Sequence, residues 1–137
     1  MNVEQTRDRL GLNMISTRTI YPDSRNLPDG PFDAILVDAP CSNSGVLGKR
    51  PEARHRVTAE NVAELSELQA RLLGAALDRL APGGRLVYST CSIEPEENHE
   101  LVLSVLAGRS DVTLLEEQEH IPGEPVDGGY QALLQRT

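Results

Sequence analysis

The sequence predicts an α/β fold in which parallel strands alternate with helices. Three observations lead to this prediction. Residues 34–37 (AILV) form a continuously apolar run, which is typical of a parallel strand buried on both faces. Apolar side chains then recur at helical spacing from Val62 to Leu80, and a second strand-like run (RLVY) follows at residues 85–88. Strand, helix and strand in this order predict a right-handed βαβ unit.

Composition places the chain among ordinary globular proteins. It has 137 residues, 39% of them apolar and 25% charged, which is enough to bury the core of one domain. The net charge of −8 excludes a self-sufficient nucleic-acid binder, because such affinity comes mainly from clustered Lys and Arg. Two cysteines 50 positions apart make neither a disulfide framework nor a metal site. Without a secretory signal or a membrane-spanning run, we expect a reduced, cytoplasmic protein that has no membrane contact.

The N-terminal quarter gives weaker patterns than the strand that follows it. Residues 3–10 are expected to form a short helix, and residues 14–20, rich in β-branched side chains, a short strand. The strand over residues 32–38 is the clearest element of the chain. It stops before Pro40, since proline cannot continue a central ladder. The SNSG segment at residues 42–45 is then expected to be flexible.

The crossover helix is expected to begin after Thr58, a plausible N-cap. A break near Ala63 is possible in this pattern, and the PGG sequence at residues 82–84 is expected to end the helix. The second strand would then deliver Cys91 to its carboxyl end. Pro95 suits the first turn of the next helix, where neighbouring glutamates favour the positive end of the helix dipole.

The C-terminal part is expected to form a hairpin. The helix begun at Pro95 should end at Gly108, and residues 112–115 (VTLL) should form a strand. Residues 116–129 are acidic and contain Gly and Pro, which predicts a loop. Residues 130–134 (YQALL) would then form the last strand, paired with the one before.

Three side chains with reactive or polar groups should meet at one edge of the sheet. Asp38 and Cys41 follow the first strand and Cys91 follows the second, so all lie at the carboxyl ends, where open α/β sheets bind ligands. A thiol beside a carboxylate and a second thiol suits nucleophilic catalysis, and a helix N-terminus after Cys91 would lower its pKa. The glutamates beside Pro95 oppose that effect. The alternative is that both cysteines are small buried apolar residues.

Two sequence blocks carry a resemblance to a known family. Residues 38–46 (DAPCSNSGV) and 89–98 (STCSIEPEEN) resemble the two signature blocks of the Sun/Fmu-type (Nol/Nop/Sun) RNA cytosine-5 methyltransferases. Residues 50–54 (RPEAR) and 127–130 (DGGY) are also similar to that family. The resemblance covers nearly the whole chain from about Val3. It implies a Rossmann-like, S-adenosylmethionine-dependent methyltransferase fold.

The resemblance also implies a role for each of the three clustered side chains. Cys91 would be the nucleophile that adds to carbon 6 of cytosine, which makes carbon 5 reactive enough to accept a methyl group. Asp38 would hydrogen-bond the base. Cys41 would assist loss of the carbon 5 proton and release of the product. The target base has to leave any stack to enter such a site.

The family resemblance extends to cofactor and RNA contacts. S-adenosylmethionine would be the methyl donor, with Asp23 beside its adenine and with Asp38 and Pro40 in the part of its site that this chain carries. The substrate would be an RNA, either rRNA or tRNA. The residues expected to contact its backbone are Arg50, Arg54 and Arg56.

One family feature is missing from the chain. The glycine-rich strand-turn-helix that holds the methionine part of the cofactor has no counterpart, because Gly83 and Gly84 close a helix in the predicted pattern. We therefore expect residues 1–137 to be the C-terminal part of one methyltransferase catalytic domain, a truncated or split protein with an incomplete cofactor site and little activity alone. A missing first strand would expose the edge of the strand at residues 32–38, which favours self-association.

Two other functions remain open from sequence. The first is a catalytically silent module that binds RNA or a protein partner through the basic loop at residues 49–56. The second is a thiol enzyme of redox or hydrolase type. That enzyme would need one of the chain's three histidines within hydrogen-bond reach of Cys91.

Overall fold

The computed structural model describes residues 3–21, 23, 26–55, 57–123 and 126–137. Their centre is a four-stranded mixed sheet with the strand order β1-β2-β4-β3. The pair β1 and β2 is parallel, whereas β4 is antiparallel to both of its neighbours. The predicted α/β class and the terminal hairpin are confirmed. The strands are β1 (Phe32–Asp38), β2 (Leu80–Thr90), β3 (Val112–His120) and β4 (Gly129–Arg136).

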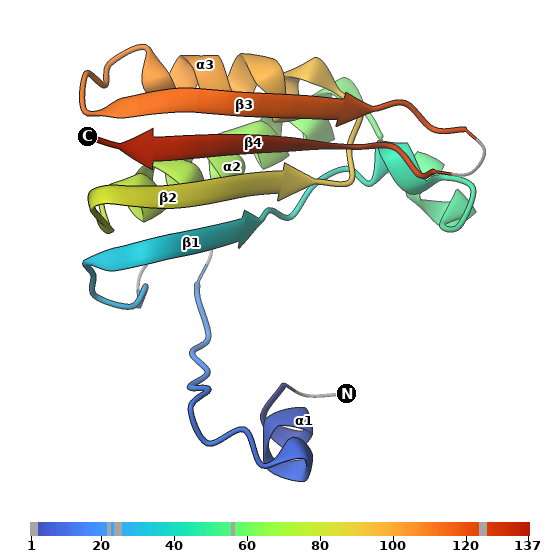
Figure 1. Ribbon diagram of the computed structural model, residues 1–137. Coiled ribbons are helices and arrows are strands. Elements are labelled where there is room, and N and C mark those ends of the chain that lie inside the picture. The colour runs from blue at the N-terminus through green and yellow to red at the C-terminus, as the bar shows by residue number, and fades with distance from the viewer. Residues whose placement is uncertain (1–2, 22, 24–25, 56, 124–125) are drawn as a thin grey trace.

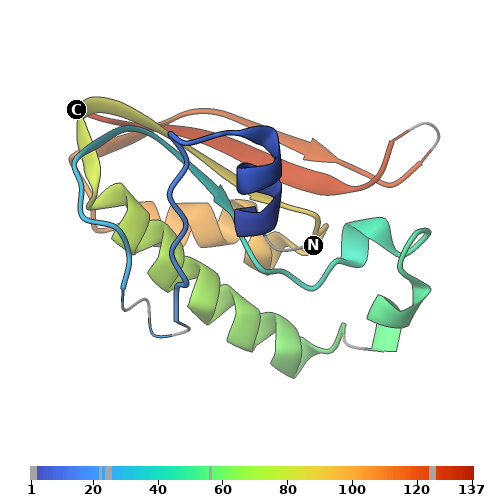
Figure 2. The ribbon, with the colours of Figure 1, turned by 90° about the horizontal axis from the view of Figure 1, so that it is seen from below.

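Two helices pack on one face of the sheet, as Figures 1 and 2 show. They are α2 (Ala59–Leu77) and α3 (His99–Leu106). Alternate side chains of the inner strands point toward them, which follows from the two-residue period of a strand. None of the helices in the described ranges is both long and apolar enough to cross a bilayer. The core includes Leu73, Leu77, Leu80, Leu86, Tyr88, Leu101, Val102, Tyr130, Ala132 and Leu134, all buried.

The first helix, α1 (Val3–Leu10), forms as expected but buries none of its side chains. In Figure 1 it lies away from the sheet, below β1. The strand expected at residues 14–20 is absent, and all of its residues are exposed. β-branched composition favours a strand only where a neighbouring strand offers hydrogen bonds, and this segment pairs with none of the described strands. That expectation is therefore wrong.

The junction between α2 and β2 also differs from the expectation. Helix α2 runs unbroken through Ala63 and begins at the predicted cap, where the Asn61 N–H donates to Thr58 Oγ1 at 3.2 Å. It ends at Leu77, and β2 begins at Leu80, so the PGG sequence lies inside the strand. The pairing of β2 with β1 is interrupted between residues 80 and 85. A bulge of this kind accommodates Pro and Gly because the extra residues need no ladder hydrogen bonds.

The hairpin is longer than predicted. Strand β3 continues to His120, so the first third of the expected acidic loop is strand that pairs with β4. Residues 116–119 are exposed on this edge strand. Charged side chains are common on edge strands, where they hinder pairing with a further chain. Acidic composition alone therefore did not distinguish an edge strand from a loop.

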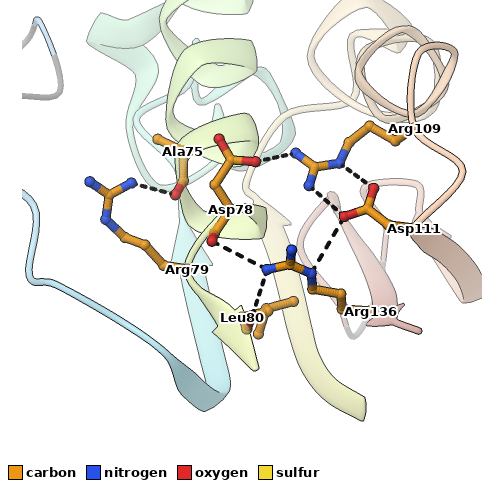
Figure 3. A network of polar contacts seen from close by, with 7 residues as sticks. All are labelled: Ala75, Asp78, Arg79, Leu80, Arg109, Asp111 and Arg136. Carbon is orange, nitrogen blue, oxygen red and sulfur yellow. Dashed lines mark hydrogen bonds and ion pairs between the residues drawn. The ribbon is translucent and has the colours of Figure 1, made fainter. Parts of the chain in front are cut away.

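A group of charged side chains joins α2, β4 and the loop after α3 at the end of the sheet where β2 begins (Figure 3). Arg109 bridges Asp78 at 2.6 Å and Asp111 at 2.9 Å. Arg136 contacts Asp111 at 3.4 Å and donates to the Leu80 carbonyl at 2.8 Å. The hydrogen bond from Arg109 holds the pKa of Asp111 below its usual value.

We expect Asp111→Asn to lower the urea midpoint of unfolding at neutral pH but not in strong acid. A depressed folded-state pKa stabilises the protein above the ordinary pKa of about 3.9, and this contribution is lost as pH falls through the folded value. The measurement is the difference in urea midpoint between the two proteins at pH 7 and near pH 2. Asn at the exposed Asp29 is the control and should give little difference at either pH. A constant difference across the range would show that the ion pairs contribute nothing.

Candidate active site

Strands β1 and β2 bring the two cysteines together at their carboxyl ends. Asp38 pairs with Ser89 in the parallel register, and the Ala39 N–H donates to the Ser89 carbonyl at 2.9 Å. The Sγ atoms of Cys41 and Cys91 lie 3.3 Å apart, and both residues are partly buried. Two thiols from separate strand ends thus share one site.

Asn43 links the two cysteines. Its backbone has φ of 62°, a left-handed conformation that asparagine tolerates better than most residues. Its Nδ2 donates to the Cys41 carbonyl at 2.9 Å, and its Oδ1 accepts from Cys91 Sγ at 3.0 Å. The sequence pattern did not single out Asn43 for this role; it placed the residue only in a segment expected to be flexible.

The two thiols have different surroundings. Burial raises the pKa of Cys41 to about 12, so Cys41 is protonated at neutral pH and can donate a hydrogen bond. Cys91 does not precede an α-helix directly, since Pro95 begins a 3₁₀ turn (Pro95–Glu97) and α3 starts only at His99. The expectation that an α-helix begins at Pro95, just after Cys91, is therefore wrong.

Glu97 joins the loop that follows Cys41 to the loop that contains Cys91. Its side chain is fully buried, and its carboxyl group accepts hydrogen bonds from both loops and from α2. Oε1 accepts from the Ser42 N–H at 2.9 Å and from Gln69 Nε2 at 2.9 Å. Oε2 accepts from the Ser42 hydroxyl at 2.5 Å and from the Ser92 hydroxyl. Composition assigned Glu97 to the helix dipole together with Glu94 and Glu96, and nothing in the sequence separates the three.

The segment expected to be flexible is instead anchored. Ser42, Ser44 and Gly45 are buried, and the Ser44 hydroxyl accepts from the Ile93 N–H at 3.0 Å. The Gly45 N–H donates to the Cys91 carbonyl at 3.0 Å. Small polar side chains are common in flexible loops, but they also fit where two backbones approach closely. Here the second reason applies.

The end of the second signature block folds back onto its start. Thr90 Oγ1 donates to Asn98 Oδ1 at 2.6 Å, and Asn98 Nδ2 donates to the Ser92 carbonyl at 2.9 Å. The Tyr88 hydroxyl donates to the Glu97 carbonyl at 2.8 Å. Residues 89–98 thus form one closed loop around Cys91, which explains why the block is a continuous stretch of sequence.

The DGGY segment packs against the same loops. The Gly128 N–H donates to the Gly45 carbonyl at 2.8 Å. A Cβ on Gly129 would lie 2.8 Å from the Thr90 carbonyl oxygen, so only glycine permits this approach. Lys49 Nζ lies 2.6 Å from Asp127 Oδ2 in an exposed ion pair. Three segments distant in sequence therefore converge on Cys91.

Asp38 and Pro40 lie in the wall of a cavity that neither cysteine lines. This cavity of about 660 Å³ lies between β1, α2 and the segment that leads to β1. Its other walls are mostly apolar, and they include Tyr21, Leu36 and Leu72. An apolar slot with one carboxylate at its edge fits the adenosine part of a nucleoside cofactor. Within the described chain, the Asp38 carboxylate makes no hydrogen bond, so the structure does not join it to either thiol. Asp23 is exposed in a turn close in sequence to the cavity wall.

The basic loop forms a 3₁₀ turn, Pro51–His55, whose Ala53 is buried. Arg50 and Arg54 are both exposed around it. Arg56, the third predicted RNA contact, lies outside the described residues. Two of the three predicted RNA contacts are thus accessible at the surface.

Among the described residues, no hydrogen bond joins a histidine to Cys91. His99 Nδ1 lies 2.9 Å from Glu117 Oε2, which also accepts from the Tyr130 hydroxyl at 2.7 Å. These contacts lower the pKa of Glu117, with the tyrosine making the larger contribution. Across the described residues, no three His, Cys, Asp or Glu side chains converge as metal ligands would.

Comparison with known sequences identifies relatives of this chain. The profile described as 16S rRNA methyltransferase RsmB/F matches residues 1–132. Ribosomal RNA small subunit methyltransferase B of Klebsiella pneumoniae is 44% identical over 102 residues, which cover 74% of this chain and 22% of that protein. The protein of the same name from Salmonella paratyphi B is 42% identical over 111 residues, or 75% and 26% of the two chains. The chain thus spans about a quarter of these relatives' length.

Solved structures give the same result for the fold. PH0851 superposes with a TM-score of 0.88 at 31% identity, over 98% of this chain and 34% of that chain. NSun6 from Pyrococcus horikoshii, solved with the S-adenosylmethionine analogue SFG, superposes with a TM-score of 0.80 at 27% identity, over 97% and 37%. The predicted Rossmann-like methyltransferase fold, present in part, is confirmed.

Proposed function

Because the chain belongs to the RsmB/F family of 16S rRNA methyltransferases, we propose that it is the catalytic part of an S-adenosylmethionine-dependent rRNA cytosine-5 methyltransferase. The observation that supports this proposal is the pair of thiols, 3.3 Å apart, at the carboxyl ends of β1 and β2. Both come from the blocks that resemble the cytosine-5 enzymes. Such thiols belong in a reducing compartment, which fits a cytoplasmic protein.

Cys91 is the proposed nucleophile. Its sulfur forms a bond to carbon 6 of an unstacked cytosine, and the electron pair of the ring double bond then becomes available at carbon 5. Asp38 is proposed to hydrogen-bond the ring. S-adenosylmethionine, when bound, supplies an electrophilic methyl group, and the residues proposed to hold its adenosine part are Asp23, Asp38 and Pro40.

Cys41 is the proposed release group. Product forms when carbon 5 loses its proton and the bond between carbon 6 and Cys91 breaks. As a protonated thiol 3.3 Å away, Cys41 can give its proton to the departing Cys91 sulfur, and it can then accept the proton from carbon 5. Arg50, Arg54 and Arg56 are proposed to contact the RNA backbone.

Opposite effects of the two cysteine variants on a covalent RNA adduct would test these roles. In a chimaera where this chain replaces the matching region of the Klebsiella pneumoniae relative, Cys41→Ala should accumulate an RNA–protein complex stable in denaturing gels. Cys91→Ala should abolish it, because no bond to carbon 6 can form. The double variant is the control and should also give none. An adduct in Cys91→Ala would show that the roles are assigned wrongly.

The second candidate is a catalytically silent module that binds RNA or a protein partner. It is favoured by the two exposed arginines of the 3₁₀ turn in an otherwise acidic chain. Measuring RNA binding beside the covalent adduct separates the two candidates. Salt-sensitive RNA binding that needs Arg54, persists in Cys91→Ala and never becomes covalent would favour this second function.

We also propose that the chain self-associates through β1. This strand is an edge of the described sheet, and its residue Leu36 is 70% exposed. An exposed apolar edge can pair with a second copy. Sedimentation should show a concentration-dependent dimer, weakened about tenfold or more by Leu36→Lys. Leu115→Lys, on the opposite edge strand β3, should leave it unchanged; a monomer at every concentration would contradict the proposal.

A further inference from the structure

The two thiols are placed for a reaction with each other. They are the chain's only cysteines, and their Sγ atoms lie 3.3 Å apart. A disulfide has an S–S bond of about 2.05 Å, so closure needs a movement of only about 1.2 Å. Hydrogen bonds hold the two loops together on both sides of the pair, from the Ala39 N–H to Ser89 and from the Gly45 N–H to the Cys91 carbonyl.

We propose that Cys41 and Cys91 are a site of reversible oxidation, which hydroperoxides close to an intramolecular disulfide. Both residues are partly exposed, so a molecule as small as hydrogen peroxide can reach them. No other thiol of the chain competes for the first oxidised sulfur. The inference rests on the geometry of the pair and not on the proposed methyl transfer.

The proposed order of the two steps rests on the burial of Cys41. Burial keeps Cys41 protonated at neutral pH, whereas the thiolate is the form that attacks a peroxide. In the proposed order, Cys91 is the sulfur oxidised first, and Cys41 is the one that resolves it. In the reduced chain, Asn43 contacts both Cys91 Sγ and the Cys41 carbonyl and so holds the two cysteines close together before the first step.

The peroxide is the only oxidant that the reaction needs. The Cys91 thiolate attacks one peroxide oxygen and the O–O bond breaks; with one proton taken up, the products are a sulfenic acid and water. The Cys41 sulfur then attacks the oxidised sulfur of Cys91. The S–S bond forms, the S–O bond breaks, and the hydroxide leaves as water with the proton of Cys41. Two thiols are oxidised and one peroxide is reduced.

Oxidation would also inactivate the proposed active site. The disulfide removes the nucleophile and the release group together, and a thiol reductant restores both. Covalent RNA adducts should then be lost on oxidation and recovered on reduction, if the proposed function holds. The oxidation itself can be measured without RNA or cofactor.

Intact mass and thiol titration of the full chain test the inference. After exposure to one equivalent of hydrogen peroxide, the chain should lose both thiols together and about 2 Da of mass. It should stay monomeric on a non-reducing gel, and dithiothreitol should return both thiols. A covalent dimer, or a mass gain of about 16 or 32 Da with one thiol left, would overturn the proposal.

Single variants test the order of the steps. In Cys41→Ser, Cys91 should react with peroxide at nearly the native initial rate but stop as an oxygenated cysteine. In Cys91→Ser, the reaction of Cys41 with peroxide should be slower than the native reaction by a factor of about ten or more, because Cys41 is the protonated thiol. Equal rates would overturn the assigned order, and circular dichroism of both variants checks that they fold. The native chain alone decides whether the disulfide forms.

Discussion

Glu97→Ala should lower the free energy of unfolding by about 3–5 kcal/mol, a large share of the stability of a small domain. The carboxyl group accepts four hydrogen bonds inside the protein, from Ser42, Ser92 and Gln69. Removing it leaves buried donors without partners, at about 1–3 kcal/mol for each group that stays unpaired. Urea unfolding followed by circular dichroism measures the difference.

Glu96→Ala is the matched control for this prediction. Glu96 is the preceding residue, has the same side chain and is exposed, so its loss should change stability by about 0.5 kcal/mol or less. The Glu97 variant should also form the Cys41–Cys91 disulfide more slowly, because the carboxyl group ties both cysteine loops to α2. Equal stability of the two variants would mean that Glu97 does not hold these loops.

Gly45→Ala should destabilise the protein by about 3 kcal/mol, at the upper end of what over-packing costs. A Cβ at this position would lie 2.5 Å from the Gly128 carbonyl oxygen and 2.9 Å from that of Cys91. Both obstacles are backbone atoms, so no change of rotamer can relieve the clash. The Cys41 loop would have to move away from the Cys91 loop, which separates the thiols.

Gly48→Ala provides the control in the same loop. A Cβ there meets no atom within 4 Å, and the substitution should be close to neutral. The two variants can be compared by urea midpoint and by the rate at which hydrogen peroxide closes the disulfide. If Gly45→Ala formed the disulfide as fast as Gly48→Ala, the close contact between the loops would not control the distance between the thiols.

The elements that could be predicted from sequence are those whose pattern is local. The apolar run of β1, the helical spacing of α2 and the Thr58 cap each depend on neighbouring residues, and each is observed. The meeting of Cys41 and Cys91 follows from one further rule, that the ends of parallel strands share an edge. These features needed no knowledge of distant contacts.

Other features depend on a partner that the sequence does not identify. Residues 14–20 have the composition of a strand but pair with none of the strands that the structure describes, whereas residues 116–119 have the composition of a loop and pair with β4. The start of β2 at Leu80 likewise required a bulge opposite β1. Secondary structure in a sheet is decided by hydrogen bonds between distant segments, so composition gave the wrong assignment at these places.

By itself, the sequence determined the α/β class, the βαβ order and the strand ends that carry the two thiols, because these depend on local periodicity and chain direction. Only the tertiary structure decided which residues support the thiols. Glu97, Asn43 and Gly45 act through contacts with residues far along the chain. The sequence does not show whether a glutamate is buried or exposed. Burial and close approach exist only after the chain has folded.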